Sequence, residues 1–172
     1  YSDAESDVLD HFELNAAPAN GTLYNDANSN GVIDGASEEL TNGETVSKAD
    51  LDAGHLKFKP DADDNGVSYT TFDFRVNDGS DYSVTAYTIT VDVTAVNDEP
   101  SFTKGANESV LEDAGAQTVN GWATAISEGP SDESGQTLTF SVTNDNNGLF
   151  SVQPDVDEAT GDLTYTPAAN TS

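Results

Sequence analysis

The feature that most constrains the fold is a strict alternation of apolar and polar residues in two neighbouring segments. In "TTFDFRVNDG", Phe72, Phe74 and Val76 alternate with polar residues, and in "YTITVDV" every second residue from Tyr87 to Val93 is apolar. A period of two is typical of antiparallel strands with one buried face. The intervening "NDGSD" consists of turn-forming residues. The two segments therefore predict a β-hairpin, or its equivalent across two sheets.

The rest of the chain contains shorter strand candidates separated by turn signals. Asn-Gly pairs favour positive φ and mark turns between these candidates. One window, "SKADLDAG", predicts a single short helix that Ser47 caps and Gly54 ends. Many short strands with turn-rich joints predict an all-β fold of antiparallel β-sandwich type. The shorter candidates are "VLDHFEL", "GTLY", "HLKFK", "LTFSV", "LFSVQ" and "DLTYT".

A weak internal repeat divides the chain. "LKFKPDADDNG" aligns with "LTYTPAANTS", so that Leu56 matches Leu163 and Pro60 matches Pro167 at the same separation. We expect tandem modules at residues 1–98 and 99–172, the first lacking its opening strands and the second its closing hairpin. Because open sandwiches expose strand edges, the modules are expected to belong to a longer array or to receive strands from another chain.

The charge of the chain excludes several partners. It has 172 residues with 32 acidic and 5 basic side chains, a formal net charge of −27. Such a surface repels nucleic acid and anionic lipid, and no apolar run is long enough to insert into a membrane. Without cysteine, neither disulfides nor thiolate metal sites can stabilise a thin core. Divalent cations bound by clustered carboxylates are the expected substitute, beside the simpler alternative of a solvated acidic surface.

Several motifs carry a family resemblance. "VNDEPSF", within the joint "AVNDEPSF" at residues 95–102, resembles the calcium-binding inter-domain linker of cadherins, with one residue fewer before Pro100. "TVSKADLDAGHLKFKPDADDNG" and "FDFRVNDG" resemble cadherin-like repeats of giant bacterial surface proteins, and "LEDAGAQTVNGWATAISEGPSDESGQTLTFSV" resembles a sister repeat. The resemblance implies cadherin-like or immunoglobulin-like tandem modules in extracellular or cell-surface adhesins, often of the repeats-in-toxin type, stiffened by Ca²⁺ at their joints.

The segment "DANSNGVIDG" provides the first candidate calcium site. Its spacing matches an EF-hand loop, with Gly31 at the turn position, but position 12 is Ser37 rather than Glu. Strands rather than helices are expected on both sides, so the segment is interpreted as a calcium-loop candidate at 26–38, inserted into one module. The alternative is a hairpin tip that binds nothing. The candidate ligands are Asp26, Asn28, Asn30, the carbonyl of Val32, Asp34 and Glu38.

Two further groups of acids are candidates. By the resemblance to the cadherin linker, Asn97 and Asp98 would bind an ion at the joint, assisted by Glu112 and Asp113, by Asp132 with its neighbour Glu133, and by Asp78. The third group combines Asp3 and Glu5 with Asp61 and Asp63. Asp and Asn also form turns without any metal, and that alternative remains open for both groups.

The expected function is a calcium-stabilised extension module of an adhesin, whose partners are neighbouring modules of the same chain or array. One alternative is a subunit that polymerises into an extracellular filament with like chains by strand complementation. Another is a carbohydrate-binding module that uses Trp122, although a lone Trp in a β-sandwich is more often in the core. Catalysis is not indicated, because His11 and His55 stand in no nucleophile or metal motif.

Overall fold

The computed structural model describes residues 8–170. The chain divides into two compact units after Val96, two residues before the expected boundary. Both units consist of antiparallel strand pairs, so the chain is all-β, as the alternating pattern predicted. Within the described residues, no helix is both long and apolar enough to cross a membrane.

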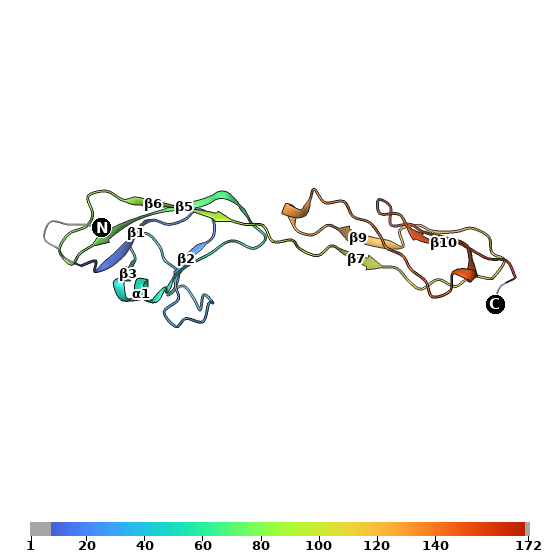
Figure 1. The fold of residues 1–172 in the computed structure, drawn as a ribbon, viewed down its shortest axis with the longest axis horizontal. Coiled ribbons are helices and arrows are strands. Elements are labelled where there is room, and N and C mark those ends of the chain that lie inside the picture. Colours follow the sequence, from blue (N-terminus) through green and yellow to red (C-terminus); the bar gives the residue numbers. More distant parts are fainter. Residues whose placement is uncertain (1–7, 171–172) are drawn as a thin grey trace. The chain divides into compact units, whose positions relative to one another are not determined.

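The first unit contains two sheets (Figure 1). The larger has the order β3-β1-β5-β6, and the long strand β5 pairs with β1 on one side and β6 on the other. The smaller pairs β2 with β4. The predicted hairpin segments are therefore neighbouring strands. The strand bounds are β1 His11–Ala16, β2 Thr22–Asn25, β3 Thr45–Ser47, β4 Leu56–Lys59, β5 Gly66–Asn77 and β6 Tyr87–Val93.

Both sheets of the first unit contribute side chains to one core. Leu14 of β1 and Val46 of β3 are fully buried, and Leu23 of β2 belongs to the same cluster. Phe12 stacks on Phe74 with ring centroids 5.0 Å apart. The alternation in β1 and β5 thus directs every second side chain to this core, while His11 remains partly exposed and contacts Asp10 and the Tyr82 hydroxyl.

The predicted helix is present as α1, Lys48–Ala53. The Ser47 hydroxyl accepts a hydrogen bond from the Asp50 backbone N–H, and Gly54 ends the helix with a φ of 73°. Asp50 in turn accepts hydrogen bonds from the Ser47 hydroxyl at 2.6 Å and, at Oδ1, contacts His55 Nδ1 at 2.9 Å. These two contacts, the hydroxyl first, lower the pKa of the Asp50 carboxyl.

The second unit contains a three-stranded sheet of order β10-β11-β8 and a separate pair of β7 with β9. Its buried apolar side chains are Ala123, Val156 and Tyr165. The bounds are β7 Ser101–Lys104, β8 Gln117–Val119, β9 Ala123–Ser127, β10 Phe150–Val156 and β11 Leu163–Pro167, with 3-10 helices η1 Ser131–Glu133 and η2 Asn147–Leu149.

One predicted strand is absent. The segment "LTFSV", residues 138–142, keeps its alternating sequence but belongs to no strand among the described residues. A strand is defined by the partner it pairs with, and no neighbouring backbone pairs with this segment. Conversely, β3, β7, β8 and β9 were not predicted; β3 and β8 have only three residues each, too few for periodicity to be detected.

Candidate metal centre

The loop at residues 26–38 is closed at its base by backbone hydrogen bonds. Asn25 N–H donates to the Glu38 carbonyl at 2.8 Å, and Asp26 N–H donates to the His55 carbonyl at 2.9 Å. Tyr24 and Glu39 form an isolated antiparallel bridge beyond the base. β2 therefore precedes the loop and a β-bridge follows it. Strand-like backbone, rather than the two helices of an EF-hand, holds this loop.

Asp26 organises the first half of the loop from a buried position. It is 2% exposed, and its Oδ1 and Oδ2 accept hydrogen bonds from the backbone N–H groups of Asn30 and Gly31, both at 3.0 Å. Gly31 has a φ of 75°, a left-handed conformation that glycine adopts without strain. The sharp turn expected at this position is present, and it wraps the backbone around the Asp26 carboxylate.

The side chains of Asn28 and Asn30 turn into the loop and meet at Asp34. Asn28 Oδ1 accepts a hydrogen bond from the Asn30 backbone N–H, and Asn30 Oδ1 accepts one from the Val32 backbone N–H. Their Nδ2 groups both donate to Asp34 Oδ2, each at 2.7 Å. Two side-chain amides therefore donate to the same carboxylate oxygen of Asp34.

Glu38, and not Ser37, closes the loop. Its Oε2 accepts from the Asp34 N–H at 2.8 Å, and its Oε1 lies 3.4 Å from Asn28 Nδ2. The one-residue displacement of the acid relative to an EF-hand is thus absorbed within the loop. Of the six predicted ligand residues, the side chains of Asp26, Asn28, Asn30, Asp34 and Glu38 are brought together, and Val32, 57% exposed, contributes its backbone to the same ring of contacts.

The donor set fits a hard cation in chemical type. Three carboxylates and two side-chain amides supply oxygen, the element that Ca²⁺ prefers. Within residues 8–170, however, no three His, Cys, Asp or Glu side chains are grouped closely enough to hold a metal ion by themselves. In this arrangement the side chains of Asn28 and Asn30 lie against Asp34, so a coordination sphere in this loop would have to include Asn oxygens beside the carboxylates.

The predicted joint residues belong to a polar cluster at the start of the second unit. Asp98 N–H donates to Glu133 Oε1 at 3.0 Å, and Gln136 Nε2 donates to Asn97 Oδ1 at 3.0 Å and to Glu133 Oε2. Glu133 is only 6% exposed, whereas its neighbour Asp132 is exposed. Glu133, from the "SDESG" motif, is therefore the acid that folds against Asn97 and Asp98.

Glu112 and Asp113 are not part of that cluster. β7 pairs with β9 so that Ser101 faces Ser127, and the chain runs along β7 away from Asp98. Glu112 and Asp113 follow β7, lie in an exposed turn, and precede β8, whose direction leads back toward β9. The hydrogen bonds that hold Glu133 beside Asp98 do not involve these two acids, and their expected grouping with Asp98 stays a prediction.

Asp78 is likewise far from the end of the first unit at which the chain leaves β6. In β5, Gly66 faces Val93, and Asn77, eleven residues later, faces His11. At about 3.3 Å per residue, these two ends are roughly 35 Å apart. Asp78 follows Asn77, and its Oδ1 accepts from the N–H groups of Ser80 and Asp81 within its own turn. Its expected place at the boundary is therefore corrected.

In the turn before β5, Asp61 and Asp64 form hydrogen bonds with uncharged groups. Asp61 Oδ2 accepts from Gly21 N–H at 2.9 Å and lies 3.2 Å from the Tyr69 hydroxyl, which is also 3.2 Å from Asp64 Oδ2. Partial burial, together with these two carboxylates, raises the pKa of Tyr69. Asp63 occupies the left-handed region at a φ of 60°. Their proposed partners Asp3 and Glu5 lie outside the described residues.

Trp122 is half-buried rather than part of the core. Its indole N–H donates to the Ala106 carbonyl at 2.9 Å, and Lys104 Nζ lies 5.7 Å from the ring centroid. A Cβ on Gly105 would lie 2.5 Å from the Trp122 carbonyl oxygen. The ring is therefore packed closely on its own unit, and one of its faces already has a cationic neighbour.

Comparison with models of known protein families, with curated proteins and with solved structures found no match.

Proposed function

We propose that the chain contributes two calcium-stabilised extension modules to a secreted or cell-surface adhesin. The single observation that carries the proposal is the closed loop at 26–38, in which Asp26, Asp34 and Glu38 converge with two Asn side chains. A long polar insertion with three acids is costly to order by hydrogen bonds alone. A divalent cation would offset both the repulsion and the ordering entropy.

Cation binding in the loop would replace the amide N–H groups that now contact Asp34 with the cation. The amide Nδ2 groups of Asn28 and Asn30 now face Asp34 with the positive end of their dipoles. A bound Ca²⁺ would bring two positive charges to the three carboxylates. It would be bound by the side-chain oxygens of Asn28 and Asn30, whose Nδ2 groups now face Asp34. The backbone N–H bonds to Asp26 would remain, because they orient its carboxylate toward the loop interior.

A second ion is proposed at the cluster of Asn97, Asp98 and Glu133. Glu133 is buried, and its hydrogen-bond partners include the Asp98 backbone N–H and the Gln136 side-chain amide. In the family that the joint resembles, calcium at this position stiffens the connection between modules. With a net charge of −27, cation binding would also reduce the repulsion within each module.

A filament formed by strand complementation is the second candidate function, favoured by the segment 138–142, which has a strand-like sequence but no strand partner among residues 8–170. The carbohydrate-binding alternative has no such support, since Trp122 is engaged by its own unit.

The test of the calcium loop is a titration followed by two-dimensional NMR of the backbone amides. Calcium up to about 10 mM, above the range of extracellular modules, should shift the Gly31 and Val32 amides first. Asp34→Asn should weaken that response at least tenfold, while Glu158→Gln, an exposed acid outside the loop, should leave it unchanged. If the loop amides do not respond, or respond equally in both variants, the proposal is refuted.

A further inference from the structure

Residues 137–143 of the second unit have the sequence pattern of a strand but form none in the described part of the chain. Within that part, this segment also takes part in no backbone hydrogen bond. Its sequence nevertheless alternates, with Leu138, Phe140 and Val142 separated by Thr and Ser. Backbone N–H and C=O groups are obligatory hydrogen-bonding groups. A strand-patterned segment with none of these bonds is therefore an available pairing edge.

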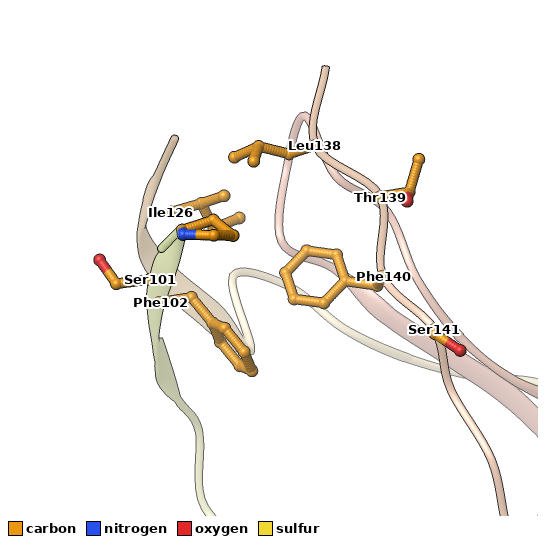
Figure 2. A pocket seen from close by; sticks show the side chains of 8 residues that line it. Ser101, Phe102, Ile126, Leu138, Thr139, Phe140 and Ser141 are labelled. Atoms are coloured by element: carbon orange, nitrogen blue, oxygen red, sulfur yellow. The ribbon is translucent and has the colours of Figure 1, made fainter. Parts of the chain in front are cut away.

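Beside this segment lies an apolar cleft of about 260 Å³ (Figure 2). Phe140 and Phe102 face each other across it, with ring centroids 5.0 Å apart at an interplanar angle of 85°. Ile126 of β9 and Leu138 contribute aliphatic side chains to the same lining. Phe102 remains 48% exposed. The second unit thus has an apolar surface, of the kind usually found in a protein core, that is partly exposed to solvent.

The first unit contains the counterpart of this surface. β2 pairs with β4 as β10 pairs with β11, and the repeat aligns β4 with β11. Before β2, the sequence "FEL" begins at Phe12 and leads to Asn20-Gly21. Before β10, "FSV" begins at Phe140 and leads to Asn147-Gly148. Phe140 and Val142 therefore correspond to Phe12 and Leu14 of β1.

In the first unit the long strand β5 pairs with β1 and lies beside the corresponding side chains in the same sheet. Phe12 faces Val76 and Leu14 faces Phe74 in the β1–β5 register. Leu14 is 0% exposed, whereas Val142, its counterpart, is 37% exposed. Phe12 stacks on Phe74 of that strand, while Phe140 has its ring contact with Phe102. Among the described residues of the second unit, no strand takes the place that β5 has beside β1 in the first unit.

We propose that residues 137–143 are an acceptor strand for a partner β-hairpin of the β5–β6 kind. The donor strand pairs antiparallel with this segment and places apolar residues at alternate positions over Phe140 and Val142, as Val76 and Phe74 do over Phe12 and Leu14. The occupant is defined by its chemistry: an alternating strand with aromatic and β-branched residues on one face. This site goes beyond the proposed calcium function and does not depend on it.

Charge favours such an occupant. Residues 134–144, "SGQTLTFSVTN", contain no charged side chain in a chain that carries 32 acids. A partner of like composition therefore meets less repulsion here than elsewhere on the molecule. The existing hairpin of a second copy is a poor donor, because Phe72 is 5% exposed and part of its own core. Its removal would expose that core.

The test is a chain extended after Ser172 by a second copy of its residues 66–96, because Ser172 aligns with Asn65 in the repeat. Amide hydrogen exchange should slow at least about a hundredfold across residues 137–143. The matched control carries the same extension with the residues that copy Phe72, Phe74 and Val76 replaced by Ser, and its exchange should match that of the unextended chain. Unchanged exchange in the extended chain would overturn the proposal.

Two further measurements identify other occupants. If the extended chain does not remain soluble, a synthetic peptide of residues 66–96 added to the unextended chain should slow the same amides and not those of β1, and no slowing would refute the site. Light scattering of the unextended chain should give a monomer mass. A concentration-dependent dimer whose protection lies at residues 137–143 would assign the surface to a second copy instead and overturn the proposal.

Discussion

Gly161 and Ala123 lie in direct backbone contact within the second unit. Ala123 N–H donates to the Gly161 carbonyl at 2.8 Å, and a Cβ built on Gly161 would lie 2.0 Å from the Ala123 carbonyl oxygen. Ala123 is 2% exposed, so the contact joins the turn before β11 to the buried start of β9. Only a residue without a side chain allows this approach.

Gly161→Ala should therefore destabilise the second unit by more than the cost of its backbone conformation. Gly115 is the matched control, since its φ of 71° equals that of Gly161 at 72° and no atom lies within 4 Å of its Cβ position. We expect a loss of about 1 kcal/mol for Gly115→Ala, and about 1–3 kcal/mol more for Gly161→Ala from steric overlap. Urea unfolding of both variants measures the difference, and equal losses would contradict the contact.

Calcium should raise the stability of the first unit. With dissociation constants of about 10⁻⁴–10⁻³ M, calcium at about 10 mM adds about 1.4–2.7 kcal/mol by mass action. Thermal melts with calcium and then with excess chelator give this difference. Asp34→Asn should remove most of it, and magnesium at the same concentration serves as the ionic-strength control. A melting temperature that is the same with calcium and chelator would contradict a stabilising ion.

Ser47→Ala should destabilise the first unit by about 1 kcal/mol, because the Asp50 N–H loses its capping acceptor. Ser109→Ala, at an exposed serine, should have an effect within about 0.5 kcal/mol of zero. Denaturant midpoints of the two variants provide the comparison. If both variants unfold at the same denaturant concentration, the cap does not contribute.

The turn before β11 should show a pH-dependent contribution from Asp157. Its Oδ1 accepts from the Thr160 N–H at 2.7 Å, from the Thr160 hydroxyl and from the Ala159 N–H, and these bonds lower the pKa of the carboxyl from its ordinary value of 3.8. Because the pKa is lower in the folded state, the stabilisation is present above about pH 4 and is lost as pH falls below 3.8 through the folded-state value.

Asp157→Ala should accordingly lower the denaturant midpoint at pH 6 and have a progressively smaller effect below pH 4. Glu158→Gln, at the adjacent exposed acid, controls for the change in net charge and should show no such convergence with the wild type. A difference between the Asp157 variant and the wild type that is independent of pH would show that the carboxylate's charge is not involved.

Sequence patterns that extend over many residues made parts of the fold predictable. The alternation around Phe72 and Phe74 predicted the paired strands β5 and β6, and the Ser47–Gly54 window predicted α1 with both of its caps. Residues 138–142 show the limit of this reasoning, because an alternating pattern predicts a strand but cannot supply its partner. Short strands such as β8 depend on pairing alone and leave no periodic signal.

The candidate sites also differ in how far the sequence alone could predict them. The convergence of side chains in the loop at 26–38 was predictable because the candidate ligands are close in sequence, so local turns alone can bring Asp26, Asn28 and Asp34 together. Groupings across the fold depended on strand direction, which composition does not encode. Glu133 was less conspicuous than Asp132 in the sequence, and only the turn at η1 buries Glu133 and leaves Asp132 exposed.

The closed base of the loop has a practical consequence for protein engineering. Asn25 and Glu38 are joined by a backbone hydrogen bond, and the Tyr24–Glu39 bridge lies directly beyond it. The chain therefore enters and leaves the loop at neighbouring points, while the core cluster draws on residues outside it. A foreign peptide, such as an epitope or a lanthanide tag, can be grafted in place of residues 27–37, provided that the buried Asp26 and its backbone hydrogen bond to His55 are kept.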